Sequence, residues 1–173
     1  NDPDAFEYAS DVLKNDFDVI VIALKRHPSM LKWASKERRN NYEFMAKMIT
    51  EYGASIAHAS SSLKDNRALA LLALQKSPWD IYCLSDGLKD DLDIARLAIK
   101  GINWAFEYVS DRLKNDEAFV QEIMSPNDPD YKNVSLEFAS ADLKDTYAIV
   151  EAAVEKEGDN IKHASNKLQV IPA

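Results

Sequence analysis

Polar and apolar positions recur along the chain with a period of 25 residues. The clearest marker is a serine, found at Ser10, Ser35, Ser60, Ser85, Ser110, Ser140 and Ser165. Each serine has an apolar residue four positions before it and a small or apolar residue directly before it, and most have a leucine three positions after it. These offsets lie on one face of a helix. The pattern predicts a first helical segment around each serine, either one short helix or two tight turns divided at the serine.

A second helical segment is predicted after each of the first six serines. The residue six positions after the serine has a side chain that can cap a helix start: Asp16, Asn41, Asn66, Asp91, Asp116 and Thr146. The apolar stripe that follows predicts helices over residues 17–26, 42–52, 67–76, 92–100, 117–124 and 147–157. One repeat buries too little apolar surface to fold alone, so neighbouring repeats must stack. The chain is therefore predicted to be an all-α solenoid of roughly seven 25-residue, two-helix repeats.

The period is interrupted once, where residues 125–133 contain five extra positions. Because the repeat resumes at once, we expect one helical-repeat domain over residues 1–173 with a loop insertion at 125–133. A linker between two independent domains is the alternative. The chain begins at Asn1 rather than at a methionine and ends in Ile171-Pro172-Ala173. We therefore expect it to be a segment of a longer protein.

A short motif recurs inside the repeat. Residues Ala9 to Asp16, Ala59 to Asn66 and Ala139 to Asp145 follow or approach the pattern A-S-x-x-L-K-x-D. The motif resembles that of a bacterial and protist helical-repeat family of unknown function, which includes secreted effector proteins of Legionella-type bacteria. The chain departs from this motif at Arg38-Arg39, Gln169 and Ile171. The repeat is also similar in plan to leucine-rich repeat variant solenoids.

These resemblances carry their own expectations. The leucine-rich repeat variant plan implies a right-handed superhelix. The effector resemblance implies delivery into a host cell, and it assigns no activity, cofactor or catalytic residue.

Composition and charge narrow the classes of partner. The formal net charge is −8, which opposes the binding of phosphate backbones, so nucleic acid is not an expected partner. The single Cys83 indicates a reducing, cytoplasmic-type environment. No apolar run is long enough for a membrane span.

Candidate chemistry is sparse, and no catalytic, cofactor-binding or metal-binding residues are predicted. His58 and His163 lie four or more repeats apart, too far to share a metal ion. The repeated serine has no His or Asp in a fixed relation to it, which disfavours a nucleophile. A base four positions after each serine forms a column, which either balances helix dipoles or binds anions: Lys14, Arg39, Lys64, Lys89, Lys114 and Lys144. The structural interpretation is favoured because acidic residues follow these bases.

Large rings recur two positions before the serine. We call the following set the ring ladder: Tyr8, Trp33, His58, Tyr108 and Phe138. Amphipathic rings in register on one face suit the capture of a protein or peptide, although packing between repeats is the simpler interpretation. The predicted function is a non-catalytic protein-interaction or scaffold module. The alternatives are a structural arm that positions an enzymatic domain elsewhere in a longer protein, and a helical repeat that binds single-stranded RNA.

Overall fold

The computed structural model describes residues 3–169, and within this range the regular structure is entirely helical, with no strand. The long α-helices are α2 (Phe17–Arg26), α4 (Tyr42–Tyr52), α6 (Arg67–Lys76), α8 (Leu92–Gly101), α10 (Glu117–Met124) and α12 (Tyr147–Lys156). Their bounds confirm the six predicted second segments to within one residue. None of the described helices is long and apolar enough to cross a membrane.

The first segment of each repeat is divided at the serine. A 3-10 helix precedes it: η1 (Pro3–Tyr8), η2 (Pro28–Trp33), η3 (Ile56–His58), η4 (Pro78–Cys83), η5 (Asn103–Tyr108), η6 (Leu136–Phe138) and η7 (Gly158–His163). A short α-helix follows it: α1 (Asp11–Asn15), α3 (Lys36–Arg39), α5 (Ser61–Lys64), α7 (Asp86–Lys89), α9 (Asp111–Lys114) and α11 (Ala141–Lys144). Of the two possibilities for this segment, the structure therefore has two turns divided at the serine.

The serine causes this division. Ser110 has an extended backbone, with φ −62° and ψ 156°, and its Oγ accepts the N–H of Leu113 at 3.2 Å. This is the geometry of a helix N-cap, which starts a new helix rather than continuing the previous one. The serines at positions 10, 35, 60, 85 and 140 accept the same bond from the residue three positions later.

The same serines join each repeat to the one before it. The N–H of Ser35 donates to the carbonyl oxygen of Lys14 at 2.8 Å, and its Oγ donates to Asn15 Oδ1 at 2.7 Å. We call this pair of bonds the serine bridge. It recurs from Ser60 to Arg39 and Asn40, from Ser85 to Lys64 and Asp65, from Ser110 to Lys89 and Asp90, from Ser140 to Lys114 and Asn115, and from Ser165 to Lys144 and Asp145. The hydroxyl can serve the helix cap and the serine bridge together because it accepts one hydrogen bond and donates another.

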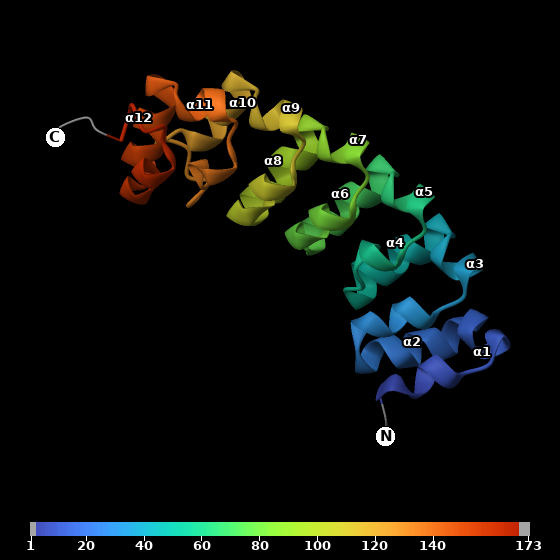
Figure 1. Ribbon diagram of the computed structural model, residues 1–173. Helices are drawn as coiled ribbons and strands as arrows, with labels where there is room; N and C mark the ends of the chain where they lie inside the picture. The colour runs from blue at the N-terminus through green and yellow to red at the C-terminus, as the bar shows by residue number, and fades with distance from the viewer. Residues whose placement is uncertain (1–2, 170–173) are drawn as a thin grey trace. The chain divides into compact units, whose positions relative to one another are not determined.

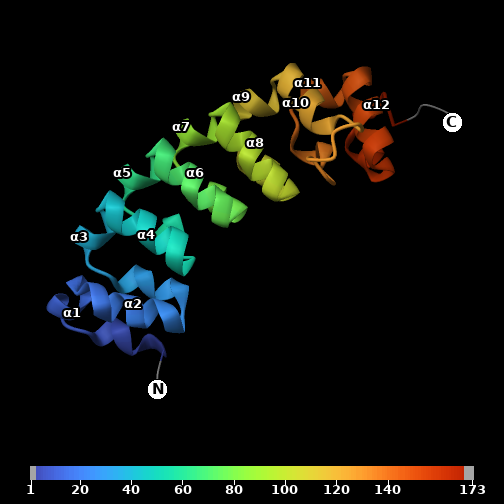
Figure 2. The same cartoon turned by 180° about the vertical axis from the view of Figure 1, so that it is seen from behind.

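The chain groups into two compact units, Asn1–Leu88 and Lys89–Ala173. In the first unit α4 lies beside α2 and α6, and in the second α10 lies beside α12 (Figures 1 and 2). The core of each unit forms where apolar stripes meet, and Ile49 and Leu69 in the first unit and Val120 and Ile149 in the second are fully buried. The boundary falls in α7 and not in the 125–133 loop. A single domain and a right-handed superhelix stay predictions.

The inserted loop between α10 and η6 is anchored by Tyr131. This ring is 1% exposed, and its hydroxyl donates to Glu122 Oε1 at 2.8 Å. The ammonium groups of Lys100 and Lys156 lie 5.3 and 5.8 Å from the ring centroid, within the range of cation–π attraction. Glu122 also accepts three hydrogen bonds from Arg96, the shortest of 2.6 Å. The predicted insertion is therefore a packed part of the second unit.

Two 3-10 helices, η3 and η6, are shorter than the others because they begin later in their repeats. In each case a buried polar side chain of the next repeat bonds the first N–H of the short helix. Residues with a left-handed backbone, Gly53 (φ 65°) and Asn133 (φ 53°), precede η3 and η6. The N–H groups of Ile56 and Leu136 are then bonded by side chains, Ile56 to Asp80 Oδ2 at 3.1 Å and Leu136 to Asn160 Oδ1 at 2.8 Å. Asp80 and Asn160 are 3% and 4% exposed. Both are needed because a buried N–H without a partner is costly.

The departures from the motif have structural explanations where they are described. Arg38 takes the leucine position, with its Nε donating to the carbonyl oxygen of Asn15 at 2.8 Å and its guanidinium 5.5 Å from the Phe44 ring. Gln169 takes the basic position, and Ile171 lies outside the described residues.

Candidate interaction face on the 3-10 helices

The ring ladder lies at one repeated place in the fold. Each of its members is the last residue of a 3-10 helix, and this register confirms that they are equivalent positions. Tyr8 is 81% exposed, and the other four rings are partly exposed. Tyr8, Trp33 and His58 belong to the first unit, whereas Tyr108 and Phe138 belong to the second. One ladder ring is thus exposed, and the other four are neither fully exposed nor fully buried.

Two ladder residues in the first unit, Trp33 and His58, are partly buried and have positively charged neighbours. The Nε1 atom of Trp33 is buried and has no hydrogen-bond partner among residues 3–169, and Lys32 Nζ lies 4.9 Å from the ring centroid. Burial lowers the pKa of His58, and the charges of Arg39, Lys64 and Lys32 lower it further. The imidazole of His58 is therefore neutral at pH 7.

No group of three or more His, Cys, Asp and Glu side chains in the described residues is arranged to hold a metal ion.

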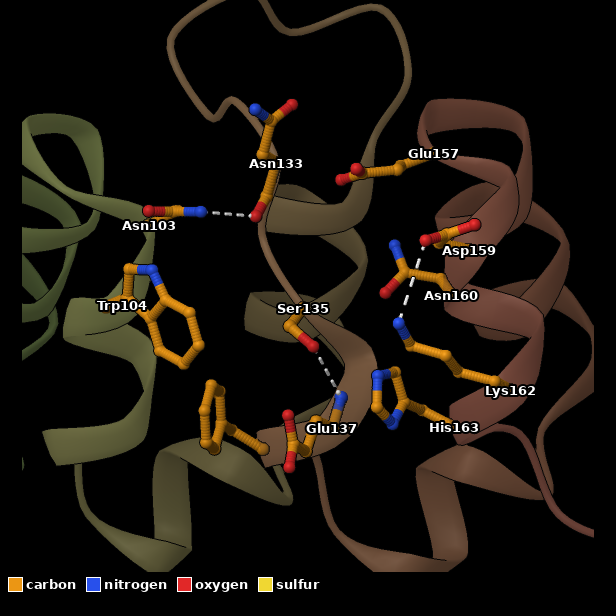
Figure 3. Close-up of a pocket in the computed structure, with 11 residues that line it drawn as sticks. Asn103, Trp104, Asn133, Ser135, Glu137, Glu157, Asp159, Asn160, Lys162 and His163 are labelled. Carbon is orange, nitrogen blue, oxygen red and sulfur yellow. Dashed lines mark hydrogen bonds and ion pairs between the residues drawn. The ribbon is translucent and has the colours of Figure 1, made fainter.

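A groove in the second unit brings one ladder ring together with residues of three 3-10 helices. Its volume is about 240 Å³, and it is bordered by η5, by the end of the inserted loop with η6, and by η7. Figure 3 shows Trp104 on one side, Asn160 and His163 on the other, and Ser135 with Glu137 between them. Phe138 lines the groove, whereas Tyr108 does not.

The aromatic wall of the groove is supported from the core. Trp104 meets the Phe138 ring edge to face, with centroids 5.8 Å apart. Phe138 packs in the same way on buried Phe106 at 6.4 Å. Trp104 nevertheless remains 50% exposed. The result is a large, oriented ring with a free surface, which is the kind of side chain that contributes most to binding energy in interfaces.

The remaining groove residues are polar, and they include three carboxylates but only one Lys or Arg. Within residues 3–169, the exposed carboxylates of Glu137 and Glu157 form no ion pair, and Asp159 pairs with Lys162 at 3.7 Å. At one end of the groove η5 is joined to the inserted loop, because Asn103 Nδ2 donates to the carbonyl oxygen of Asn133 at 2.7 Å (Figure 3). Glu157 extends into the groove from the side of η7 (Figure 3).

The charge of the chain is concentrated in the same unit. Lys89–Ala173 contains 17 Asp and Glu against 10 Lys and Arg, a formal net charge of −7, whereas Asn1–Leu88 contains 12 against 11 and is at −1. The groove therefore lies in the strongly acidic half of the sequence, where the field attracts cations.

The basic column has a local structural role. Lys114 Nζ donates to the carbonyl oxygen of Glu107 at 2.7 Å, and Lys144 Nζ donates to that of Glu137 at 2.5 Å. Both acceptors lie three positions before the serine of the same repeat. Gln169 Nε2 donates to the equivalent carbonyl oxygen, that of Lys162, at 2.8 Å without a charge. At Lys114 and Lys144 these contacts support the structural interpretation of the column, because each of these two bases bonds to the 3-10 helix before it.

The sequence interpretation overlooked three half-exposed rings on the 3-10 helices. Trp79 and Trp104 lie six positions before their serines and are 52% and 50% exposed, and Tyr82 is 50% exposed. The 25-residue spacing of the two tryptophans was the available signal. It was missed because the other repeats have no large ring in that position.

Comparison with known proteins gives a family but no activity. No match was found among curated proteins or among solved structures. The sequence model described as "Domain of unknown function (DUF4116)" matches residues 1–39, 41–89 and 91–144. These three consecutive segments cover most of the chain, and the longer two span about two serine repeats each. The chain therefore belongs to the DUF4116 family.

Proposed function

We propose that this chain is a non-catalytic interaction module that binds a peptide segment of a partner protein on the face formed by its 3-10 helices. The observation that carries the proposal is the half-exposed Trp104 ring beside a groove, fixed by Phe138 and ultimately by the core. A preorganised ring loses little conformational freedom when a partner binds, so most of the contact energy is available for affinity. The partly exposed ladder rings extend the same kind of surface through each unit.

The other candidate functions have less support. The acidic surface of the second unit disfavours a single-stranded RNA ligand. A role as an arm that positions an enzymatic domain, and delivery as a secreted effector, rest on the context of a longer protein and stay predictions.

The test is selection from a random dodecapeptide library displayed on phage, followed by fluorescence anisotropy with the selected peptides. Trp104→Ala should weaken their binding by about tenfold or more, as expected for a central ring. Tyr147→Ala is the matched control, because Tyr147 is similarly exposed (56%) but lies outside the groove. Both variants should melt within a few degrees of the parent chain, since neither ring is buried. If no peptide is enriched, or if the two variants bind the selected peptides equally, the 3-10 face is not a peptide-binding surface.

A further inference from the structure

The chemistry of the groove indicates which peptide it accepts. The half-exposed face of Trp104 offers a surface for an aliphatic stem or a planar cation. The carboxylates of Glu137 and Glu157 lie on the same groove without an ion pair among residues 3–169. An aromatic ring beside unpaired carboxylates matches a side chain that is apolar along its length and positively charged at its end.

Resting on the proposed function above, we propose that the groove between η5, η6 and η7 recognises an arginine or lysine side chain of a partner peptide. The stem packs against Trp104, and the charged end lies against the carboxylate of Glu137, while Glu157 adds negative charge at the opposite end of the groove (Figure 3). Arginine suits the site better than lysine, because its planar guanidinium can stack on the indole and still donate two parallel hydrogen bonds to a carboxylate.

The surroundings of the groove support a cationic occupant over an acidic one. The unit that contains the groove has a formal net charge of −7, so it attracts a basic segment before contact and repels an acidic one. Lys162 is the one Lys or Arg side chain on the groove, and its ammonium group is directed to Asp159. The ligand class is therefore a basic peptide segment.

The experiment uses the strongest dodecapeptide from the display selection and the complete chain. Each arginine in that peptide is replaced by citrulline, which keeps the shape and loses the charge, and each lysine by acetyl-lysine. We expect the selected peptides to be enriched in Arg and Lys, and the neutral version to bind about tenfold more weakly. Peptides selected without Arg or Lys, or a neutral version of equal affinity, would overturn this inference while leaving the proposed function intact. Failure to select any peptide would instead contradict the proposed function itself.

Matched variants separate a specific contact from general attraction to an acidic protein. Glu137→Gln combined with Glu157→Gln should weaken the charged peptide by about tenfold and leave the citrulline peptide unchanged. Glu155→Gln combined with Glu151→Gln removes the same charge from exposed positions of α12 outside the groove. If both double variants weaken binding equally, the attraction is nonspecific and the assignment of the groove is wrong.

The site of binding can be read directly. The chain has three tryptophans, so its NMR spectrum has three indole N–H signals, and Trp104→Phe identifies the relevant one. Addition of the arginine peptide should shift the Trp104 signal more than those of Trp33 and Trp79. A larger shift at either of the other two would place the peptide elsewhere and overturn the inference.

Discussion

The carboxylate of Asp80 accepts a hydrogen bond of 2.7 Å from Ser55 Oγ and one of 3.1 Å from the Ile56 N–H, both in the preceding repeat. Asp80 is 3% exposed, and neither of these two partners carries a positive charge. Burial therefore raises the pKa of Asp80 above its ordinary value of 3.8, although the two hydrogen bonds oppose the rise. The equivalent buried residue in the second unit is the neutral Asn160.

This arrangement predicts a pH dependence that Asp80→Asn removes. A carboxyl with a raised pKa binds protons more readily in the folded state, so the unfolding free energy falls as the pH rises from near 3.8 through the folded pKa and is then constant. An asparagine keeps an oxygen for the Ile56 N–H and does not titrate. We expect Asp80→Asn to lack this fall and to be at least as stable as the parent at pH 7, as measured by urea unfolding followed by circular dichroism.

Two further variants bracket this result. Asp142→Asn, on the exposed surface of α11, should change the unfolding free energy at pH 7 by less than about 0.5 kcal/mol. Asn160→Asp should lose about 1–3 kcal/mol, because the Asn160 amide donates to the carbonyl oxygens of Val134 and Ala153, which a carboxylate would oppose. A loss of more than about 1 kcal/mol in Asp80→Asn at pH 7 would show that the carboxylate is required.

The serine bridge predicts different costs for two adjacent serines. Ser60 Oγ donates to Asn40 Oδ1 at 2.6 Å and accepts the N–H of Leu63 at 3.3 Å. Ser61 is exposed and forms no such bridge. Ser60→Ala should therefore lower the unfolding free energy by about 1–2 kcal/mol, and Ser61→Ala should change it by less than about 0.5 kcal/mol. Equal effects in urea unfolding would mean that the bridge adds no stability.

The basic column predicts that a hydrogen-bond donor can replace a charge. Because Gln169 makes the contact that Lys114 and Lys144 make, Lys114→Gln should keep nearly all of the stability. Lys114→Met should lose about 0.5–1.5 kcal/mol, since it leaves the Glu107 carbonyl oxygen without this donor. For scale, Leu113→Ala empties a fully buried position and should cost about 2–5 kcal/mol. An equal loss in the two lysine variants would point to the charge itself.

Tyr131 predicts that the inserted loop is held by packing more than by its hydroxyl. Tyr131→Ala should cost about 3–5 kcal/mol and expose residues 125–133 to limited proteolysis. Tyr131→Phe should cost only about 1 kcal/mol, because Glu122 keeps its hydrogen bonds to Arg96. Proteolysis rates that match in the two variants would show that the hydroxyl, and not the ring, anchors the loop.

Much of the fold could be predicted because the information is local and repeated. Asp16 and its equivalents mark the starts of the long helices, and their apolar stripes give the ends. The division at the serine could not be decided, because the offsets of Phe6, Ala9 and Leu13 from Ser10 fit a continuous helix equally well. The acceptors of the serine bridge, such as Asn15 and Asn40, were not recognised because either a surface or a bridging role suits an asparagine beside a helix cap.

The groove was less predictable than the ladder. Phe138 was singled out from its place before Ser140, but the groove also needs Trp104 from one repeat and Glu157 from another. Those residues occupy different offsets from their serines, and a loop of irregular length lies between them. Such convergence depends on tertiary packing, which a periodic pattern does not encode.

The bridge from Ser140 shows where this architecture accepts change. Ser140 reaches Lys114 and Asn115 with the same two bonds as the other serines, although five more residues separate it from the repeat before. The extra residues enter between α10 and η6, outside the bonded elements, and the last of them, Asn133, forms part of the groove wall. Insertions at this joint can therefore reshape the groove while the serine bridges keep their register. The length of a single connection thus sets the form of a surface without altering the repeats on either side of it.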